Sequence, residues 1–466
     1  MKTTNLLSAT LLYGISDAFL LALGGFILLP LYTRNLTPED FGGFVAVKTN
    51  TELLTYALQF GLISAVGRLY FDYRIQGMEY TYIFSILVLF GLLFACAAIL
   101  ALTVGEQFWS ALSPAVPAIP YLWLALSIAV LNVLSALAAI LLRVEERVWA
   151  FVGVQALTAC VLTAATVYSL KIADLGLHGL ILSLLLSAGC GAAALPILYG
   201  RKLVPSFDAE GMRRSIGFAL PMLVGYLAYF FLNKISILIL QRYVSIELMG
   251  SYGIVIQLAL PLTVAANAFS KSLQPHIFKA DESEARTTLR VSGRIYLSLL
   301  FPVVCFLAIF AKELFSLMAP PGYANGQDAL VILSLGTFVY AGALFFDTAL
   351  WYHKRPRMSV VLTLTGCVSS IVSGLLLIPR YGIVGAALST TAGFSIVFLV
   401  SAMVTRRVLD IDYTIRFLAF LTIATLLSTG AELLERFSLS SVELLSMRAL
   451  LFGISLVVAR TTWSQT

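Results

Sequence analysis

The stretch PLYTRNLTPEDFGGF, Pro30 to Phe44, decides how the rest of the chain is interpreted. It places charged residues, a proline and two glycines between two long apolar runs. A second stretch with the same arrangement is LILQRYVSIELMGSYGI, Leu238 to Ile254. Aligned at an offset of 208 residues, the two stretches pair Arg34 with Arg242, Glu39 with Glu247, Gly42 with Gly250 and Phe44 with Tyr252. One connector is therefore written twice, which indicates an internal repeat.

The composition of the chain excludes a water-soluble globular protein. Of the 466 residues, 60% are hydrophobic and 12% are charged, and the mean hydropathy is +0.94. Soluble domains carry about 25% charged residues. Because a soluble fold would leave too much of this apolar sequence in contact with water, we expect the chain to lie in a membrane.

The apolar runs predict the number of membrane-spanning helices. About 20 apolar residues cross a bilayer as a helix, and the alternation typical of barrel strands is absent from the sequence. We therefore predict an all-α polytopic membrane protein with about fourteen transmembrane helices. The predicted spans are 9–31, 42–66, 82–104, 118–141, 149–170, 175–198, 216–240, 248–271, 294–312, 327–352, 358–378, 383–405, 414–434 and 443–460.

The basic residues predict the orientation of the chain. With the N-terminus in the cytoplasm, 21 of the 30 lysine and arginine residues fall on the cytoplasmic side and seven on the outer side. This bias follows the positive-inside rule and predicts that both termini are cytoplasmic. Contact with anionic lipid accounts for the net charge of +6, so the charge gives no reason to expect nucleic acid as a partner.

A second pair of matching stretches extends the repeat. LGLHGLILS, Leu175 to Ser183, matches YGIVGAALS, Tyr381 to Ser389, at an offset of 206 residues. Two six-helix lobes of the same orientation are therefore expected, an arrangement that permits one lobe to rock against the other. The predicted divisions are an N-terminal lobe at 1–198, a cytoplasmic linker at 199–215, a C-terminal lobe at 216–405, and two further helices with a tail at 406–466.

The connector itself has a local explanation. Pro38 and the glycines end one helix and begin the next, and Thr37 is placed to cap the new helix. Glu39 and Asp40 then lie at the positive end of that helix. The connector is thus expected to form a tight turn at the outer surface.

The sequence also resembles a known family. PLYTRNLTPEDFGGFVAV, followed by FGLISAVGRLYFDYR, is similar to the polysaccharide biosynthesis (Wzx-type) flippases, whose superfamily also contains the multidrug-extruding MATE transporters and the lipid II flippase. The resemblance covers essentially the whole chain. It implies alternating-access transport of an undecaprenyl-diphosphate-linked oligosaccharide repeat unit across the bacterial inner membrane, for O-antigen, capsule or exopolysaccharide. It also implies membrane lipid, H⁺ or Na⁺, a polysaccharide polymerase and glycosyltransferases as partners.

Ionisable residues inside the spans are the candidate functional residues, because a charge at mid-membrane is costly and normally faces a cavity or a partner. Lys48 and Glu52 share a helix face, so they either neutralise each other or present that face to a central cavity. Lys234 has no acidic residue three or four positions away. Its partner is expected to be the substrate diphosphate, Asp17 or Asp347.

We therefore predict a substrate-binding cationic patch and a set of ion-coupling carboxylates. Lys48 and Lys234 would receive the diphosphate, with Arg68 and Lys271 assisting at the cytoplasmic mouth. The candidates for binding or releasing a coupling ion are Asp17, Glu52 and Asp347. At the repeat offset none of the buried charges recurs in the other lobe, which favours a functional role over an architectural one.

Three alternatives stay open. A membrane enzyme acting on the same lipid carrier would need a sizeable catalytic loop, and the Asp410–Asp412 DxD sequence lies in a short one, so we expect no enzyme. A MATE-like cation-coupled drug exporter would favour an acidic cavity, and a lipid II flippase differs only in substrate. The sequence contains no Walker A motif, no two cysteines in a CxxC motif and no cluster of histidines, so neither a cofactor nor a metal is expected.

Overall fold

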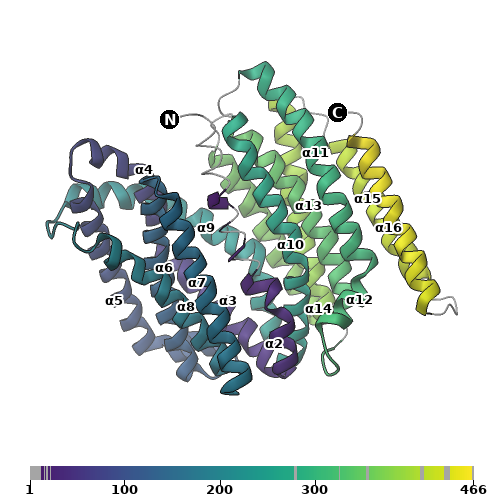
Figure 1. Ribbon diagram of the computed structural model, residues 1–466, viewed down its shortest axis with the longest axis horizontal. Helices are drawn as coiled ribbons and strands as arrows, with labels where there is room; N and C mark the ends of the chain where they lie inside the picture. Colours follow the sequence, from purple (N-terminus) through teal and green to yellow (C-terminus); the bar gives the residue numbers. More distant parts are fainter. Residues whose placement is uncertain are drawn as a thin grey trace. The chain divides into compact units, whose positions relative to one another are not determined.

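The protein folds entirely into helices within the described part of the chain. The computed structural model describes residues 12–14, 16, 19–20, 23–277, 281–324, 326–352, 356–409, 414–434 and 441–463. Every regular element in these residues is helical, so the predicted fold class is confirmed (Figure 1). By their contacts the residues form two compact units, which are unit 1 (Met1–Gly24 and Leu31–Gly250) and unit 2 (Gly25–Pro30 and Ser251–Thr466).

Unit 1 contains the first connector and the helices around it. A π-helical turn, η1 (Leu23–Ile27), precedes the connector and continues beyond the unit's boundary at Gly24. The elements that follow are α2 (Leu29–Asn35), α3 (Pro38–Gln59), α4 (Leu62–Ile75), α5 (Glu79–Leu112), α6 (Ala118–Val144), α7 (Val148–Val167), η2 (Tyr168–Ile172), α8 (Gly176–Tyr199) and α9 (Ala209–Tyr243). Helix α9 packs against α3, α4 and α5.

Unit 2 contains the remaining helices. It takes most of α10 (Ile246–Ile277), α11 (Glu282–Ile309), α12 (Ala311–Met318), α13 (Gln327–Tyr352), α14 (Pro356–Leu409), α15 (Thr414–Leu434) and α16 (Ser441–Trp463). Within it α13 packs along α14, and α11 packs against α13, α15 and α16. The division into two six-helix lobes rests on sequence repetition and stays a prediction.

The predicted spans coincide with the helices. From 42–66 onward each span falls on a described helix or pair of helices, whereas 9–31 lies partly outside the described residues. Ten of the described helices are long and apolar enough to cross a membrane, which makes this a multi-pass membrane protein. The difference of four has four origins: α14 counts once for two predicted spans, the span 9–31 lies partly outside the described residues, and neither α3 nor α16 is among the ten helices.

Breaks in the helices coincide with two glycines, one inside a predicted span and one between two predicted spans. The predicted span 42–66 is broken between α3 and α4, where Phe60 and Gly61 have φ of 48° and 74°. Gly382, with φ of 54°, breaks α14 between the two spans predicted there. Glycine adopts these positive φ values without steric cost, which locates both breaks.

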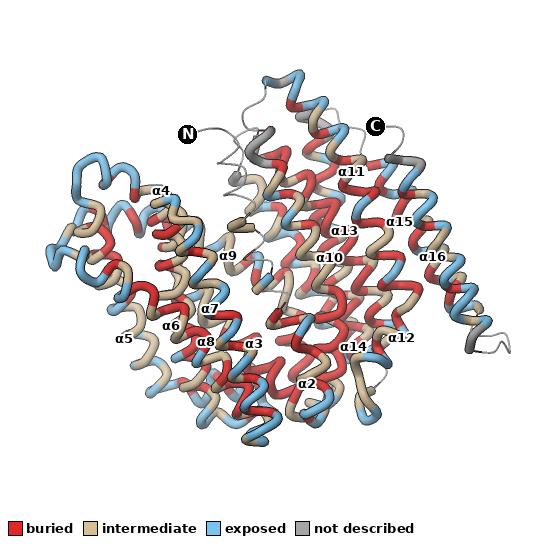
Figure 2. The backbone as a smooth tube through the Cα atoms, viewed as in Figure 1, coloured by how far each residue is buried: buried red, intermediate tan, exposed pale blue. Residues whose placement is uncertain are grey.

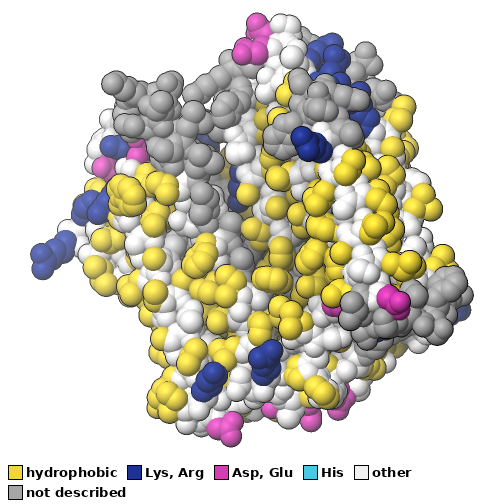
Figure 3. All heavy atoms as spheres, turned by 45° about the vertical axis from the view of Figure 1, so that its right-hand side comes forward, with side chains coloured by type: hydrophobic (Ala, Val, Ile, Leu, Met, Phe, Trp, Pro, Cys, Tyr) yellow, Lys and Arg dark blue, Asp and Glu magenta, His cyan; other side chains and the backbone are white. Residues whose placement is uncertain are grey.

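Apolar side chains both fill the units and cover them. Figure 2 shows buried residues along the sides on which the helices of each unit face one another. Large apolar side chains are also exposed on the outer sides, for example Trp149 and Ile197 at 76% each. On the face drawn in Figure 3, apolar side chains dominate the middle of the helices and most charged side chains lie toward helix ends. Lipid contact accounts for such a surface.

Candidate functional site

Helices α3 and α9 carry the candidate site, and the connector positions α3. Thr37 is the N-cap of α3 and accepts a hydrogen bond from the backbone N–H of Asp40 at 3.1 Å, as predicted from the sequence. Glu39 and Asp40 lie in the first turn, where the helix dipole favours acidic side chains. The helix then runs through Lys48 and Glu52, which share one face.

An ion pair joins the two helices. Lys234 Nζ of α9 lies 3.1 Å from Glu52 Oε2 of α3, and the two side chains are 27% and 33% exposed. The sequence analysis looked for the partner of Lys234 in the substrate, Asp17 or Asp347, and for that of Glu52 in Lys48. Neither interpretation found this pair, because no spacing in the sequence shows that α3 and α9 pack together.

Lys48 lies near this pair and completes a cluster of two lysines and one glutamate. Its ammonium group lies 5.8 Å from the centroid of the Phe44 ring, a distance typical of a cation–π contact. The charges of Glu52 and Lys234 both act on that ammonium group. One carboxylate thus lies near two lysines, and it forms its ion pair with Lys234.

Aromatic side chains continue the two facing rows one turn further along. Tyr56 follows Glu52 on α3, and its ring centroid lies 6.3 Å from that of Tyr226 and 5.9 Å from that of Phe230 on α9. Tyr226 shares a short hydrogen bond between hydroxyl groups with Ser64 of α4. These contacts hold α3 and α4 against α9 on both sides of their break, next to the ion pair.

The other described residues that the sequence predicted for the site lie on other helices. Arg68 is exposed on α4, beyond the break, and its Nη1 lies 3.8 Å from Asp72 Oδ1. Lys271 is exposed on α10 and Asp347 is half-buried on α13, both in unit 2. Asp17 lies outside the described residues. The structure thus brings Lys48, Glu52 and Lys234 together.

A polar network near the connector was missed by the sequence analysis. Asn50 Nδ2 donates to Ser113 Oγ at 2.7 Å, and Ser113 Oγ donates to Gln241 Oε1. The sequence did carry a signal for it, because Asn50 lies in a predicted span and Gln241 directly precedes the repeated arginine of the second connector. Among the described residues, no group of three or more His, Cys, Asp and Glu side chains could hold a metal.

The repeated arginine of the second connector also has a structural role. Arg242 Nε and Nη2 donate to the carbonyl oxygen of Ala111 at 3.0 and 2.8 Å. This carbonyl lies in the last turn of α5, where helix carbonyls lack partners within the helix. The arginine therefore fixes the end of α5 against α9, beside the Ser113 network.

The chain is similar in sequence to a protein family and to one curated protein. A family model described as polysaccharide biosynthesis protein matches residues 31–320. The uncharacterized membrane protein MJ1068 of Methanocaldococcus jannaschii is 23% identical over 223 residues. That alignment covers 46% of this chain and 42% of the relative, so the chain matches less than half the relative's length.

Solved structures share the fold at low sequence identity. The lipid II flippase MurJ in an inward closed conformation superposes with a TM-score of 0.73 at 14% identity, over 97% of this chain and 99% of that one. An inward-facing multidrug resistance MATE family transporter of the MOP superfamily gives a TM-score of 0.60 at 18% identity, over 88% and 95%. These two solved neighbours are a flippase and a transporter. Because the family match covers more than half of the chain, this protein belongs to the polysaccharide biosynthesis protein family.

Proposed function

We propose that this protein translocates an undecaprenyl-diphosphate-linked oligosaccharide from the inner to the outer leaflet of a bacterial inner membrane. The product would supply O-antigen, capsule or exopolysaccharide synthesis. The observation that carries the proposal is the cluster of two lysines around one glutamate, partly exposed within otherwise apolar helices. The family match and the flippase and transporter fold support it.

The two lysines would receive the diphosphate of the substrate. A dianion that approaches Lys234 competes with Glu52, because both need the same ammonium group. Binding would then release the Glu52 carboxylate, which could take up a proton or a sodium ion and couple ion movement to transport. Helices that carry such a site and rock against a second lobe would give alternating access.

The other predicted residues would act around this cluster. Arg68 is exposed and basic, as a residue that attracts phosphate at the cytoplasmic mouth should be, and Lys271 is proposed for the same role. Asp17 and Asp347 are proposed as further ion-coupling carboxylates. Both termini would be cytoplasmic, and the polymerase and glycosyltransferases of the same polysaccharide would be partners.

The leaflet distribution of lipid-linked glycans in a deletion strain tests the proposal. Complete repeat units should accumulate on the cytoplasmic leaflet, and a plasmid copy of the wild-type gene should restore export. Normal units on the outer leaflet with missing polymer would contradict the proposal and indicate a polymerase or ligase. Accumulated lipid II would indicate a lipid II flippase, and altered drug sensitivity alone would indicate an exporter.

A charge-neutralising variant tests the site. Lys234→Gln should abolish export while the protein still folds and inserts, and Lys171→Gln is the matched control because Lys171 is exposed in η2. Normal export by Lys234→Gln would overturn the role of this lysine.

A further inference from the structure

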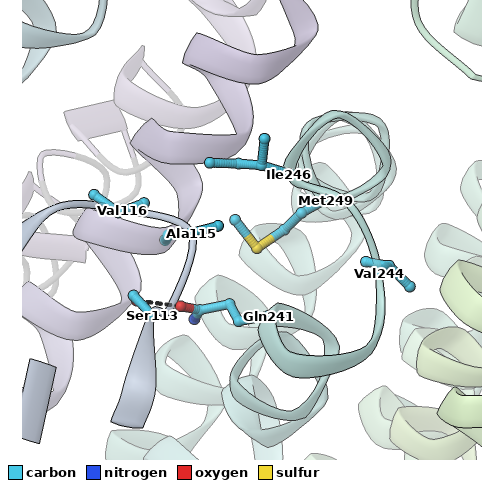
Figure 4. Close-up of a pocket in the computed structure, with 8 residues that line it drawn as sticks. Ser113, Ala115, Val116, Gln241, Val244, Ile246 and Met249 are labelled. Carbon is cyan, nitrogen blue, oxygen red and sulfur yellow. Dashed lines mark hydrogen bonds between the residues drawn. The ribbon is translucent and has the colours of Figure 1, made fainter. Parts of the chain in front are cut away.

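A small, partly open cavity within unit 1 is lined in part by residues of the second connector. Ala46 of α3, Ser113 at the end of α5, Gln241 of α9 and Met249 of α10 contribute to its wall (Figure 4). Its volume is about 10 Å³, which is the smallest space that holds one water molecule. The cavity is thus matched to an occupant of that size.

Two buried polar atoms lack partners among the described residues, one on Gln241, which lines the cavity, and one on Asn50, which donates a hydrogen bond to the lining residue Ser113. Asn50, Ser113 and Gln241 are 1%, 1% and 6% exposed. The chain of hydrogen bonds from Asn50 through Ser113 to Gln241 leaves Gln241 Nε2 and Asn50 Oδ1 without a partner. An unpaired buried polar atom costs about 1–3 kcal/mol, so two of them in one network need an explanation.

We propose that this cavity is the binding site of one ordered water molecule, which accepts a hydrogen bond from Gln241 Nε2 and donates one to Asn50 Oδ1. The two atoms offer one donor and one acceptor. A cation would need acceptors on all sides and an anion would need donors, whereas water satisfies both kinds. A polar, water-sized site with two such partners is where internal waters are found.

The water would tie together three parts of unit 1. Asn50 lies on α3 two residues before Glu52, and Gln241 lies on α9 seven residues after Lys234. The ion pair joins α3 and α9 once, and the hydrated network joins them again at the end of α5, two residues away along α3 and about two turns away along α9. The proposed water does not depend on which substrate the protein transports.

Hydroxyl-radical labelling by X-ray radiolysis tests the proposal, because radicals form wherever water resides. Met249 lines the cavity and is 2% exposed, so in a dry cavity it should react as slowly as the fully buried Phe90, after correction for intrinsic reactivity. We expect Met249 to be oxidised about tenfold faster than that standard. Oxidation at the rate of the dry core would overturn the proposal.

Two apolar variants identify the partners of the water. Gln241→Leu and Asn50→Leu should each lower Met249 oxidation about fivefold or more, while Gln107→Leu, which changes an exposed glutamine, should leave it unchanged. Unchanged oxidation in both cavity variants would contradict the assignment. Where a variant does not fold, density in the cavity of an experimental map that resolves water decides for the wild type.

Sodium dependence separates water from a bound cation. The thermal unfolding temperature of the wild type should be the same in sodium and in choline chloride at equal ionic strength. A stabilisation by sodium that disappears in Gln241→Leu would show a cation in the cavity and overturn the proposal.

Discussion

Gly42 and Gly250 lie against each other through their backbones, where α3 and the first turn of α10 cross. A Cβ atom on Gly42 would collide with the carbonyl oxygen of Ile246, and a Cβ atom on Gly250 would collide with that of Pro38. Each would also lie 3.1 Å from the backbone nitrogen of the other glycine. The contact is reciprocal, and the two glycines are 208 residues apart, as are Pro38 and Ile246, which is the offset of the repeat. It therefore supports the predicted repeat.

Alanine at either glycine should destabilise the protein. The obstructing atoms belong to the backbone, so the helices themselves must move apart. We expect Gly42→Ala and Gly250→Ala each to lower the free energy of unfolding by about 1–3 kcal/mol, as overpacking does. Gly91→Ala is the control, because a Cβ atom there has nothing within 4 Å. Thermal unfolding in detergent checks the difference, and equal melting of all three variants would contradict the close approach.

The carboxylate of Glu145 joins three helices of unit 1. Its two oxygens accept hydrogen bonds from the hydroxyls of Tyr70, Tyr80 and Tyr199 at 3.2, 3.2 and 3.1 Å. Glutamine offers one acceptor oxygen in place of two, so Glu145→Gln should cost about 2 kcal/mol of the free energy of unfolding. Each tyrosine-to-phenylalanine change should cost about 1 kcal/mol. Denaturant or thermal unfolding measures both.

The exposed Glu106 provides the matched control for that substitution. Glu106→Gln should leave the unfolding temperature unchanged, because its side chain is open to the surroundings. If Glu145→Gln were equally neutral, the three hydroxyl contacts would not contribute to stability.

Hydropathy and charge predicted the helical fold, because apolar runs and the basic residues between them can be recognised in short segments of the sequence. The break at Phe60 was missed, since phenylalanine gives no signal for positive φ and the predicted span 42–66 runs through this position. The site was half predicted. Lys48, Glu52 and Lys234 were singled out, but the pairing of Glu52 with Lys234 depends on helix packing between residues 182 positions apart, which no local pattern encodes.

Asp281 should make the stability of the protein dependent on pH in acid. It caps α11, where the backbone N–H of Glu284 and then the Ser283 hydroxyl, both at 2.9 Å, hold the pKa of its carboxyl below the usual value. Because the pKa is lowered in the folded state, the contribution is complete above the unfolded pKa of about 3.9 and is lost as pH falls through the folded pKa. Unfolding followed from about pH 6 to about pH 3 measures this loss.

Asparagine retains the capping oxygen without the titration. Asp281→Asn should therefore lose less stability than the wild type over the same acid range, whereas Glu106→Gln should follow the wild type. Parallel acid profiles for the wild type and Asp281→Asn would rule out a stabilising role for the charged cap.

Glu52 should weaken anion binding in the resting protein. Removing its charge makes the cluster more positive by one unit charge and frees Lys234 from its ion pair. We expect purified Glu52→Gln in lipid nanodiscs to bind undecaprenyl diphosphate about tenfold more tightly, equivalent to about 1.4 kcal/mol, with slower export in cells because the substrate is released less readily. The exposed Glu106→Gln should match the wild type in both assays. Unchanged or weaker binding by Glu52→Gln would show that Glu52 does not compete with the phosphate for Lys234.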